Sequence, residues 1–304
     1  MALNLMYITN DPKVAVIAEK SGVNRIFVDM EYIGKSLRQS GMDTVQFHHT
    51  LEDVKNVKKV LHSAELLVRV NPIHDATKQY SSSKEEIDAV IKAGADIIML
   101  PYFKTIREVQ FFLDLVADRA KTVFLLETPE AVKIVDQILE IPSVEQIHIG
   151  LNDLSLGYGK KFMFELLIDG TVEKLCQKFK SKGITYGCGG IASLGGGKLP
   201  AEDIIKEHYR EGSTCAILSR SFCNTSIIRD YDRIEKIFIN GVKAIREFEY
   251  ECENNLGDTD QNHRELKEKI LMICANIDAS LEDTLMAKKA LLVATVQSHI
   301  AQLH

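Results

Sequence analysis

Short apolar runs alternate with amphipathic stretches along the first 250 residues of this 304-residue chain. We predict strands at 3–8, 25–29, 65–70, 96–100, 122–126, 146–149, 185–188 and 214–218, each followed by a segment of helical periodicity. The runs are almost continuously apolar, which is typical of parallel strands buried on both faces. Eight such units in about 250 residues favour a closed (β/α)8 TIM barrel over an open doubly wound sheet.

The last 50 residues do not fit a ninth unit, so we divide the chain into a barrel at 1–252 and a C-terminal helical extension at 253–304. After a turn-like, acidic linker, two helical patterns run through 266–277 and 281–303. The stretch 285–296 is apolar on more than one side, so it requires a partner surface on the barrel or on another subunit. We therefore expect a homo-oligomer.

Composition excludes several partners and locations. The chain has 37 Lys and Arg against 43 Asp and Glu, a formal charge of −6, which gives no general attraction to nucleic acid or to an anionic membrane. No apolar run approaches the roughly 20 residues that a membrane span requires. The six cysteines form no C-x-x-C pair, and we see no signal peptide, so we expect reduced thiols and a cytoplasmic protein.

Two acidic residues follow neighbouring predicted strands. Glu127 comes directly after strand 122–126, and Asp153 lies just beyond strand 146–149. Active sites of (β/α)8 barrels lie at these strand ends, so the two carboxylates are expected to converge there. Such a pair suits Mg²⁺ or Mn²⁺, which would act as a Lewis acid on a bound carbonyl and stabilise an enolate. The structural alternative is that Glu127 caps the next helix and Asp153 holds a turn.

Basic residues at the same end offer further candidates. Arg69 closes an apolar strand, so its guanidinium must face an acidic group, either a substrate carboxylate or a barrel carboxylate such as Glu31 or Glu127. His48 and His49 form a pair in the loop after the second strand, where they either reach the barrel mouth or belong to the surface. The glycine-rich stretch 187–197 is either an anion-binding loop or a flexible one.

Five motifs, in order, resemble those of the HpcH/HpaI aldolase and citrate lyase β family, whose members are (β/α)8 barrels. They are FVDMEY, LLVRVNP, GADIIMLPYFKT, LLETPEAV and IGLNDLSLGYG, and the resemblance covers residues from about 25 to 220. The most specific part is ETPEAV followed by IGLNDLS, with Glu127 and Asp153 in these two motifs. The resemblance implies reversible retro-aldol cleavage of 2-oxo-4-hydroxy acids to pyruvate and an aldehyde, or of 3-hydroxyacyl-CoA esters.

The resemblance also implies roles for individual residues. Glu127 and Asp153 correspond to the divalent-metal ligands, and Arg69 to the arginine that binds the oxo acid. Backbone amides at Gly150, Leu151 and Asn152 correspond to those that hold the substrate carboxylate.

One motif departs from the family pattern. The aldolases usually carry Asp-x-Glu-His after the second strand, and that His works with an Asp in proton transfer. Here the motif is Asp29-Met30-Glu31-Tyr32, so a tyrosine replaces the histidine. A phenol with an ordinary pKa of about 10 is a poor base near neutrality. Either Tyr32 acts as a general acid, or His48 or His49 takes over, or the aldol step is lost.

Two functional hypotheses follow. The first is a metal-dependent carbon–carbon lyase that cleaves or forms a 2-oxo-4-hydroxy acid through a pyruvate enolate, with an aldehyde as the other partner. The nearby Lys35 and Arg38 suggest that this partner is anionic, such as an acidic or phosphorylated sugar. The second is an oxo-acid-binding or assembly protein that keeps the metal site and lacks the base.

Overall fold

The computed structural model is a closed barrel of parallel strands that run around the barrel in chain order. It describes residues 2–35, 48–255 and 257–301, with side chains up to residue 280. β1 pairs with β2 on one side and with β8 on the other, which closes the barrel. The strands are β1 (Asn4–Ile8), β2 (Arg25–Asp29), β3 (Glu65–Arg69), β4 (Ile97–Leu100), β5 (Lys121–Leu126), β6 (Gln146–Ile149), β7 (Thr185–Ile191) and β8 (Cys215–Leu218). The predicted (β/α)8 barrel is confirmed.

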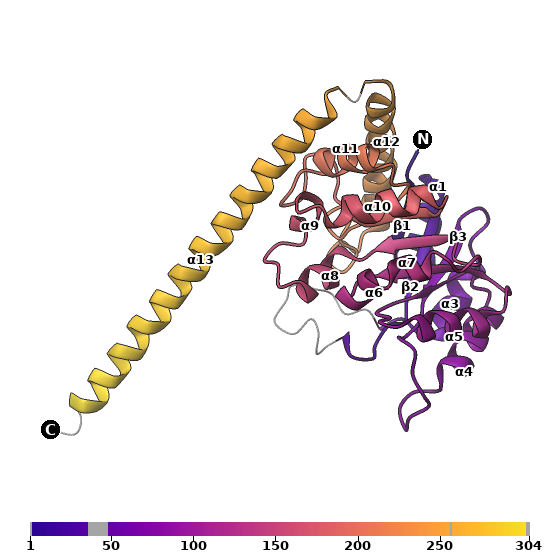
Figure 1. The fold of residues 1–304 in the computed structure, drawn as a ribbon, viewed down its shortest axis with the longest axis horizontal. Helices are drawn as coiled ribbons and strands as arrows, with labels where there is room; N and C mark the ends of the chain where they lie inside the picture. Colours follow the sequence, from indigo (N-terminus) through magenta and orange to yellow (C-terminus); the bar gives the residue numbers. More distant parts are fainter. Residues whose placement is uncertain (1, 36–47, 256, 302–304) are drawn as a thin grey trace.

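Helices follow the strands and cover the outside of the barrel (Figure 1). They are α1 (Pro12–Lys20), α3 (Leu51–Lys58), α4 (Ser83–Lys92), α5 (Ile106–Val116), α6 (Pro129–Lys133), α7 (Val135–Ile138), α8 (Leu151–Gly157), α9 (Glu165–Ile168), α10 (Thr171–Ser181), α11 (Ala201–Glu211), α12 (Tyr231–Asn254) and α13 (Thr259–Ala301).

The strands are buried on both faces, as their apolar sequences predict. Phe27, Leu67, Met99 and Leu125 belong to the small cluster that fills the barrel interior. The alternate residues of the same strands pack outward against the helices in the main core. Because the interior is filled by side chains, substrate chemistry is confined to the strand ends and the loops that follow them.

Local signals in the sequence set several helix boundaries. Asp11 caps α1 through its side chain, with Pro12 in the first turn, and Ser82 forms a capping box with Glu85 at the start of α4. The helical region predicted around 164–182 is instead two helices, α9 and α10. Gly170 lies between them with φ +83, a left-handed conformation that ends one helix and begins the next.

The C-terminal extension is one long helix rather than the two predicted segments. No Gly or Pro occurs in α13 to break it, so its 43 residues run without interruption. Leu266 and Ile270 are buried, and α13 contacts α9 and α11 before it runs away from the barrel (Figure 1). Leu271 and Met272 are exposed. The apolar stretch 285–296 falls beyond the described side chains.

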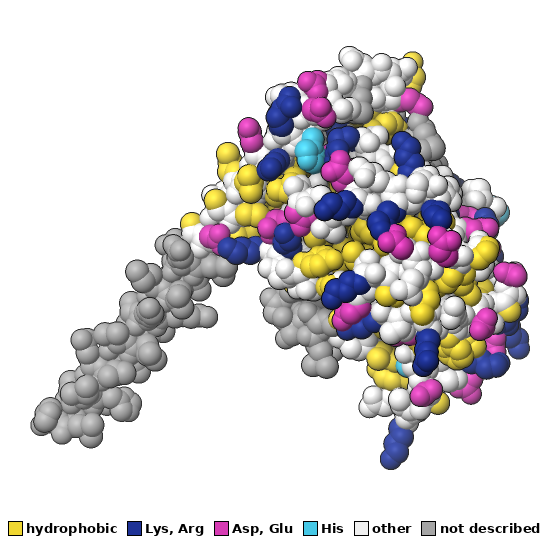
Figure 2. Space-filling model, in the orientation of Figure 1, with side chains coloured by type: hydrophobic (Ala, Val, Ile, Leu, Met, Phe, Trp, Pro, Cys, Tyr) yellow, Lys and Arg dark blue, Asp and Glu magenta, His cyan; other side chains and the backbone are white. Residues whose placement is uncertain are grey.

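Basic and acidic side chains are interspersed over the face of the molecule seen in Figure 2. Within the part of the chain that the structure describes, no helix has the length and apolar character needed to cross a membrane.

Candidate active site

Two neighbouring strands end in residues of opposite charge. Asp29 is the last residue of β2 and Arg69 the last residue of β3, and the two are direct partners in the register of this strand pair. Residues paired across parallel strands point to the same face of the sheet. Both side chains therefore lie at the C-terminal mouth of the barrel, above the ring of Phe27, which the Arg69 guanidinium covers at 5.5 Å.

Arg69 binds Asp29 in a bidentate ion pair. Its Nε donates to Asp29 Oδ1 at 2.8 Å and its Nη2 to Asp29 Oδ2 at 2.7 Å, while Nη1 lies 3.4 Å from Glu31 Oε2. The sequence left open whether Arg69 faces a substrate or a barrel carboxylate. In this structure it faces Asp29 and Glu31, and its side chain keeps 13% exposure at the mouth.

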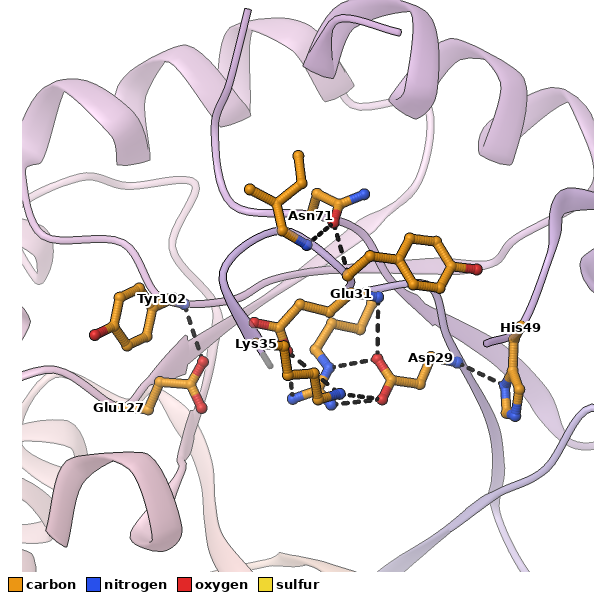
Figure 3. A network of polar contacts seen from close by, with 10 residues as sticks. Asp29, Glu31, Lys35, His49, Asn71, Tyr102 and Glu127 are labelled. Carbon is orange, nitrogen blue, oxygen red and sulfur yellow. Dashed lines mark hydrogen bonds and ion pairs between the residues drawn. The ribbon is translucent and has the colours of Figure 1, made fainter. Parts of the chain in front are cut away.

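Lys35 completes this group of buried charges (Figure 3). Its Nζ donates to Asp29 Oδ2 at 2.6 Å and lies 3.6 Å from Glu31 Oε2. Burial opposes the charge on Asp29, but Arg69 and Lys35 outweigh it and hold the pKa of this carboxyl well below its usual range. Asp29 is therefore ionised near neutrality and serves as an anchor for two cations rather than as a proton acceptor.

His49 supports the same aspartate from the other side (Figure 3). The backbone N–H of Asp29 donates to His49 Nδ1 at 3.0 Å. Because a backbone N–H can only donate, Nδ1 uses its lone pair in this bond and Nε2 carries the proton of the neutral ring. Burial lowers the pKa of His49, which keeps the ring neutral. Taking up a further proton would break the bond to Asp29, so this geometry suits a structural histidine better than a catalytic base.

Tyr32 is held by a side chain from the end of β3. Asn71 Oδ1 accepts hydrogen bonds from the backbone N–H groups of Tyr32 and Ile33 at 2.8 and 2.9 Å. The Asn71 amide is in turn fixed by Glu86, to which its Nδ2 donates at 2.8 Å. This arrangement ties the loop after β2 to α4, and so fixes the backbone from which the Tyr32 ring projects.

The Tyr32 ring stacks on His48, with ring centroids 5.8 Å apart and an interplanar angle of 10°. Burial and the charge on Asp29 raise the pKa of Tyr32 to about 12. The phenol is therefore protonated throughout the neutral range, so its resting form is a proton donor. Of the two histidines that the sequence offered, His48 is exposed and adjacent to this phenol.

Glu127 stands at the end of β5 with a buried carboxylate. Its Oε1 accepts the backbone N–H of Tyr102 at 3.0 Å, and Tyr102 adopts φ +49, a left-handed conformation that is costly for a tyrosine (Figure 3). Gly150 makes room for the other oxygen. A Cβ added at Gly150 would lie 2.7 Å from Glu127 Cβ and 2.8 Å from Oε2, so a larger residue there would displace the carboxylate.

Asp153 lies in the first turn of α8, directly after β6 and only three residues beyond Gly150. The N–H of Gly150 donates to Leu126 in the barrel at 3.0 Å and is not offered to a substrate. Leu151 and Asn152 occupy the first helical turn, where amides have no acceptor within the helix. Of the predicted carboxylate-binding amides, these two remain suited to the role.

Glu127 and Asp153 fit a hard divalent cation in chemistry and in burial. Both are carboxylates, they are 4% and 7% exposed, and the space at Gly150 keeps Glu127 Oε2 beside the start of α8. Among the described residues no group of three or more His, Cys, Asp and Glu forms a complete protein cage for a metal. A two-carboxylate site that leaves coordination positions for water and substrate is typical of Mg²⁺.

Comparison with known proteins bears on this geometry. The family model for HpcH/HpaI aldolase/citrate lyase matches residues 4–186, well over half of the chain. The chain belongs to the HpcH/HpaI aldolase/citrate lyase family. This confirms the resemblance in the sequence motifs, and it makes the protein a member of a family of aldolases and lyases that generally use divalent metals.

Among solved structures, the fold is similar to that of the HpcH/HpaI aldolase from Desulfitobacterium hafniense DCB-2. The two chains are 14% identical, the match covers 81% of this chain and 93% of the other, and the TM-score is 0.53. At this identity the likeness bears on the fold alone. A search of curated proteins returned no match.

Three features of the site were not predicted from the sequence. Lys35 was predicted to face an anionic partner, whereas its ammonium turns inward to Asp29. The contact between Tyr102 and Glu127 depends on a backbone conformation that the residue type does not signal. The role of Asn71 had one signal, a polar residue in an otherwise apolar strand end. Arg38 lies outside the described residues.

Proposed function

We propose that the protein is a divalent-metal-dependent carbon–carbon lyase that cleaves or forms a 2-oxo-4-hydroxy acid through a pyruvate enolate. Family membership supports the class of reaction. The observation that carries the finer proposal is that Glu127 and Asp153 are both buried carboxylates and that they follow neighbouring strands at the mouth of the barrel.

In this proposal Glu127 and Asp153 hold Mg²⁺ or Mn²⁺. When bound, the ion supplies Lewis-acid polarisation of the oxo group of the substrate. Glu127 keeps its place through the Tyr102 N–H and through the absence of a side chain at Gly150.

The oxo acid is bound by donors of the chain itself. Arg69 has five N–H bonds, of which two are directed at Asp29 and one at Glu31, so its exposed edge retains donors for a substrate carboxylate. The backbone amides of Leu151 and Asn152 are the second set of donors.

Proton transfer is assigned to the stacked pair at the mouth. In the cleavage direction, His48 takes the proton of the C4 hydroxyl as the C3–C4 bond breaks and the aldehyde leaves. Tyr32 then gives a proton to C3 of the enolate, which yields pyruvate, and His48 restores the phenol. The raised pKa of Tyr32 supports the donor role, and the hydrogen bond at His49 Nδ1 argues against His49 as the acceptor.

For the second substrate we propose only its chemical class, an aldehyde. Of the two cations that suggested an anionic or sugar-derived acceptor, Lys35 is turned toward Asp29, and Arg38 lies outside the described residues.

The second candidate function is an oxo-acid-binding protein without turnover. It is favoured by Tyr32 in place of the family's histidine, because a phenol with a pKa of about 12 does not accept protons near neutrality. The two functions differ in whether the bound oxo acid exchanges its protons.

Proton NMR of pyruvate in D2O, with the protein and Mg²⁺ or Mn²⁺, separates them. In the proposed lyase the protonation of C3 runs in reverse: His48 takes the phenol proton while Tyr32 takes a methyl proton of pyruvate. Deuterium then enters the methyl group, and a chelator stops the exchange. Tight metal-dependent binding of oxalate without any exchange would favour the binding protein. If neither exchange nor binding occurs, both proposals are wrong.

We also propose a homo-oligomer in the cytoplasm. The oligomer is supported by α13, which leaves the barrel after its first turns and carries the apolar stretch 285–296 of the sequence. The location is supported by the cysteines, all six of which are free thiols.

A further inference from the structure

Asn71 lies just beyond the end of β3, where its side-chain amide links the loop after β2 to helix α4. The residue is buried, with 4% of its surface exposed. Its Oδ1 accepts the backbone N–H groups of Tyr32 and Ile33 at 2.8 and 2.9 Å, which uses both lone pairs of that oxygen (Figure 3). On the other side, Asn71 Nδ2 donates to Glu86 Oε1 at 2.8 Å.

Glu86 fixes which way the Asn71 amide points. The backbone N–H of Asn71 also faces this buried carboxylate, at 3.2 and 3.3 Å from its two oxygens, so Glu86 accepts hydrogen bonds from two groups of Asn71. If the amide were reversed, its oxygen would face the Glu86 oxygens and its NH2 group would face two N–H donors. Buried polar groups without partners are costly, so the amide is held in the orientation that offers an acceptor to Tyr32.

The position of the Tyr32 ring depends on this link. The N–H that Asn71 holds belongs to Tyr32 itself, and the ring is only partly buried, stacked on the exposed His48. A shift of the Asn71 amide therefore moves the backbone from which the phenol projects. Misplacing a reacting group by about 1 Å can lower a reaction rate about 100-fold.

We propose that Asn71 is a positioning residue that holds the Tyr32 phenol in place at the barrel mouth, with Glu86 fixing the orientation of its amide. Asn71 acts through the backbone of Tyr32 and does not transfer a proton itself. Glu86 acts through Asn71. The effect on catalysis rests on the proposed function, because it takes Tyr32 as the proton donor, whereas the placement of the ring can be measured without turnover.

The test exchanges the donor and the acceptor between the two side chains. In Asn71→Asp, two carboxylates that can only accept face each other, and in Glu86→Gln an NH2 group faces one of the donors of Asn71. The double variant Asn71→Asp/Glu86→Gln again sets one donor against one acceptor, with the direction reversed and the net charge of the wild type. Glu85→Gln is a matched control, because it removes the same charge from the neighbouring residue, which is exposed and binds the N–H of Ser82.

Two measurements follow the variants. The first is the maximal rate of deuterium exchange into pyruvate with Mn²⁺, which should fall about 10- to 100-fold in each single variant and by more than any loss of affinity for oxalate. The second is the NMR signal of the Tyr32 ring in protein labelled with ¹³C-tyrosine, assigned by its loss in Tyr32→Phe. This signal should move in both single variants.

The double variant should return the exchange rate to within about fivefold of the wild type and the Tyr32 signal to its original place, because the two changes are coupled through one hydrogen bond. Glu85→Gln should match the wild type in both measurements. An unmoved Tyr32 signal in folded Asn71→Asp would overturn the proposal, as would a double variant no better than the single ones.

Two further outcomes are decisive. If a single variant does not fold, a folded double variant with the wild-type ring signal supports the proposal, and an unfolded double variant overturns it. If the wild type shows no exchange, but the Tyr32 signal moves in the single variants and returns in the double variant, the proposed function fails while the role of Asn71 in placing the ring stands.

Discussion

Replacing Asp29 with asparagine tests how strongly the buried charges depend on one another. Asp29 is fully buried and accepts two hydrogen bonds from Arg69, one from Lys35 and one from the N–H of Glu31. In Asp29→Asn one carboxylate oxygen becomes an NH2 group, which confronts cationic N–H donors and leaves them unpaired. Breaking a buried ion pair by removing one partner costs about 3–5 kcal/mol. We expect the free energy of unfolding to fall by this amount at pH 7.

The effect depends on pH in a defined direction. The pKa of Asp29 is lower in the folded protein than the value of about 3.9 in an unfolded chain. The carboxylate therefore stabilises the fold fully above about pH 5, and this stabilisation is lost as the pH falls below about 4 toward the folded pKa. The difference between wild type and Asp29→Asn should be constant from about pH 5 to 8 and should shrink below about pH 4 by up to about 1.4 kcal/mol per pH unit.

Urea unfolding followed by circular dichroism measures both effects. Asp88 is a matched control, since it also binds one lysine and one arginine, at 2.8 Å to Lys84 and 2.7 Å to Arg119, but on the exposed surface. Asp88→Asn is expected to change the free energy of unfolding by no more than about 1 kcal/mol. If Asp29→Asn were as stable as Asp88→Asn at pH 7, Asp29, Arg69 and Lys35 would not be the tightly coupled buried charges that we describe.

Three further predictions concern the site and the extension. Gly150→Ala should weaken Mn²⁺ binding at least about tenfold and lower the free energy of unfolding by about 1–3 kcal/mol, because the added Cβ would lie 2.8 Å from Glu127 Oε2. Unchanged Mn²⁺ affinity in calorimetry would contradict this prediction. Tyr32→Phe should slow deuterium exchange into pyruvate about 100-fold and leave the affinity for oxalate unchanged. Because the phenol keeps its proton, the exchange rate of the wild type should not fall between pH 7 and 10 through ionisation of Tyr32. An unaffected exchange rate in Tyr32→Phe would remove Tyr32 from the mechanism. Deleting residues 256–304 should reduce the particle mass in light scattering by more than the deleted mass, and an unchanged subunit number would exclude the extension as the interface.

The barrel could be predicted from the sequence because the physics of its strands is local. A strand such as 97–100 is apolar at every position, and burial on both faces of a parallel sheet accounts for that pattern. The order of the strands then follows from the strand–helix alternation. The long helix α13 was divided in the prediction at 277–281, although the sequence there contains no residue that breaks a helix.

The site could be predicted only in part. Glu127, Asp153 and Arg69 were proposed as site residues because each lies at the end of a strand or just beyond it, and strand ends meet at the mouth of a barrel. The partners of Arg69 depend on side-chain directions and on how the loop after β2 folds back, which brings Lys35 to Asp29. The same holds for His49, whose hydrogen bond to the backbone of Asp29 decides which ring nitrogen carries the proton.

The central claim is that Glu127 is part of a working enolate site. The most direct test is deuterium exchange into pyruvate, measured by proton NMR with Mn²⁺ or Mg²⁺, for Glu127→Gln and Glu130→Gln. Glu130 is a matched control, a glutamate three residues further on that pairs with Lys104 on the surface. We predict that exchange is lost in Glu127→Gln and retained in Glu130→Gln. Exchange at the wild-type rate in Glu127→Gln would contradict the account.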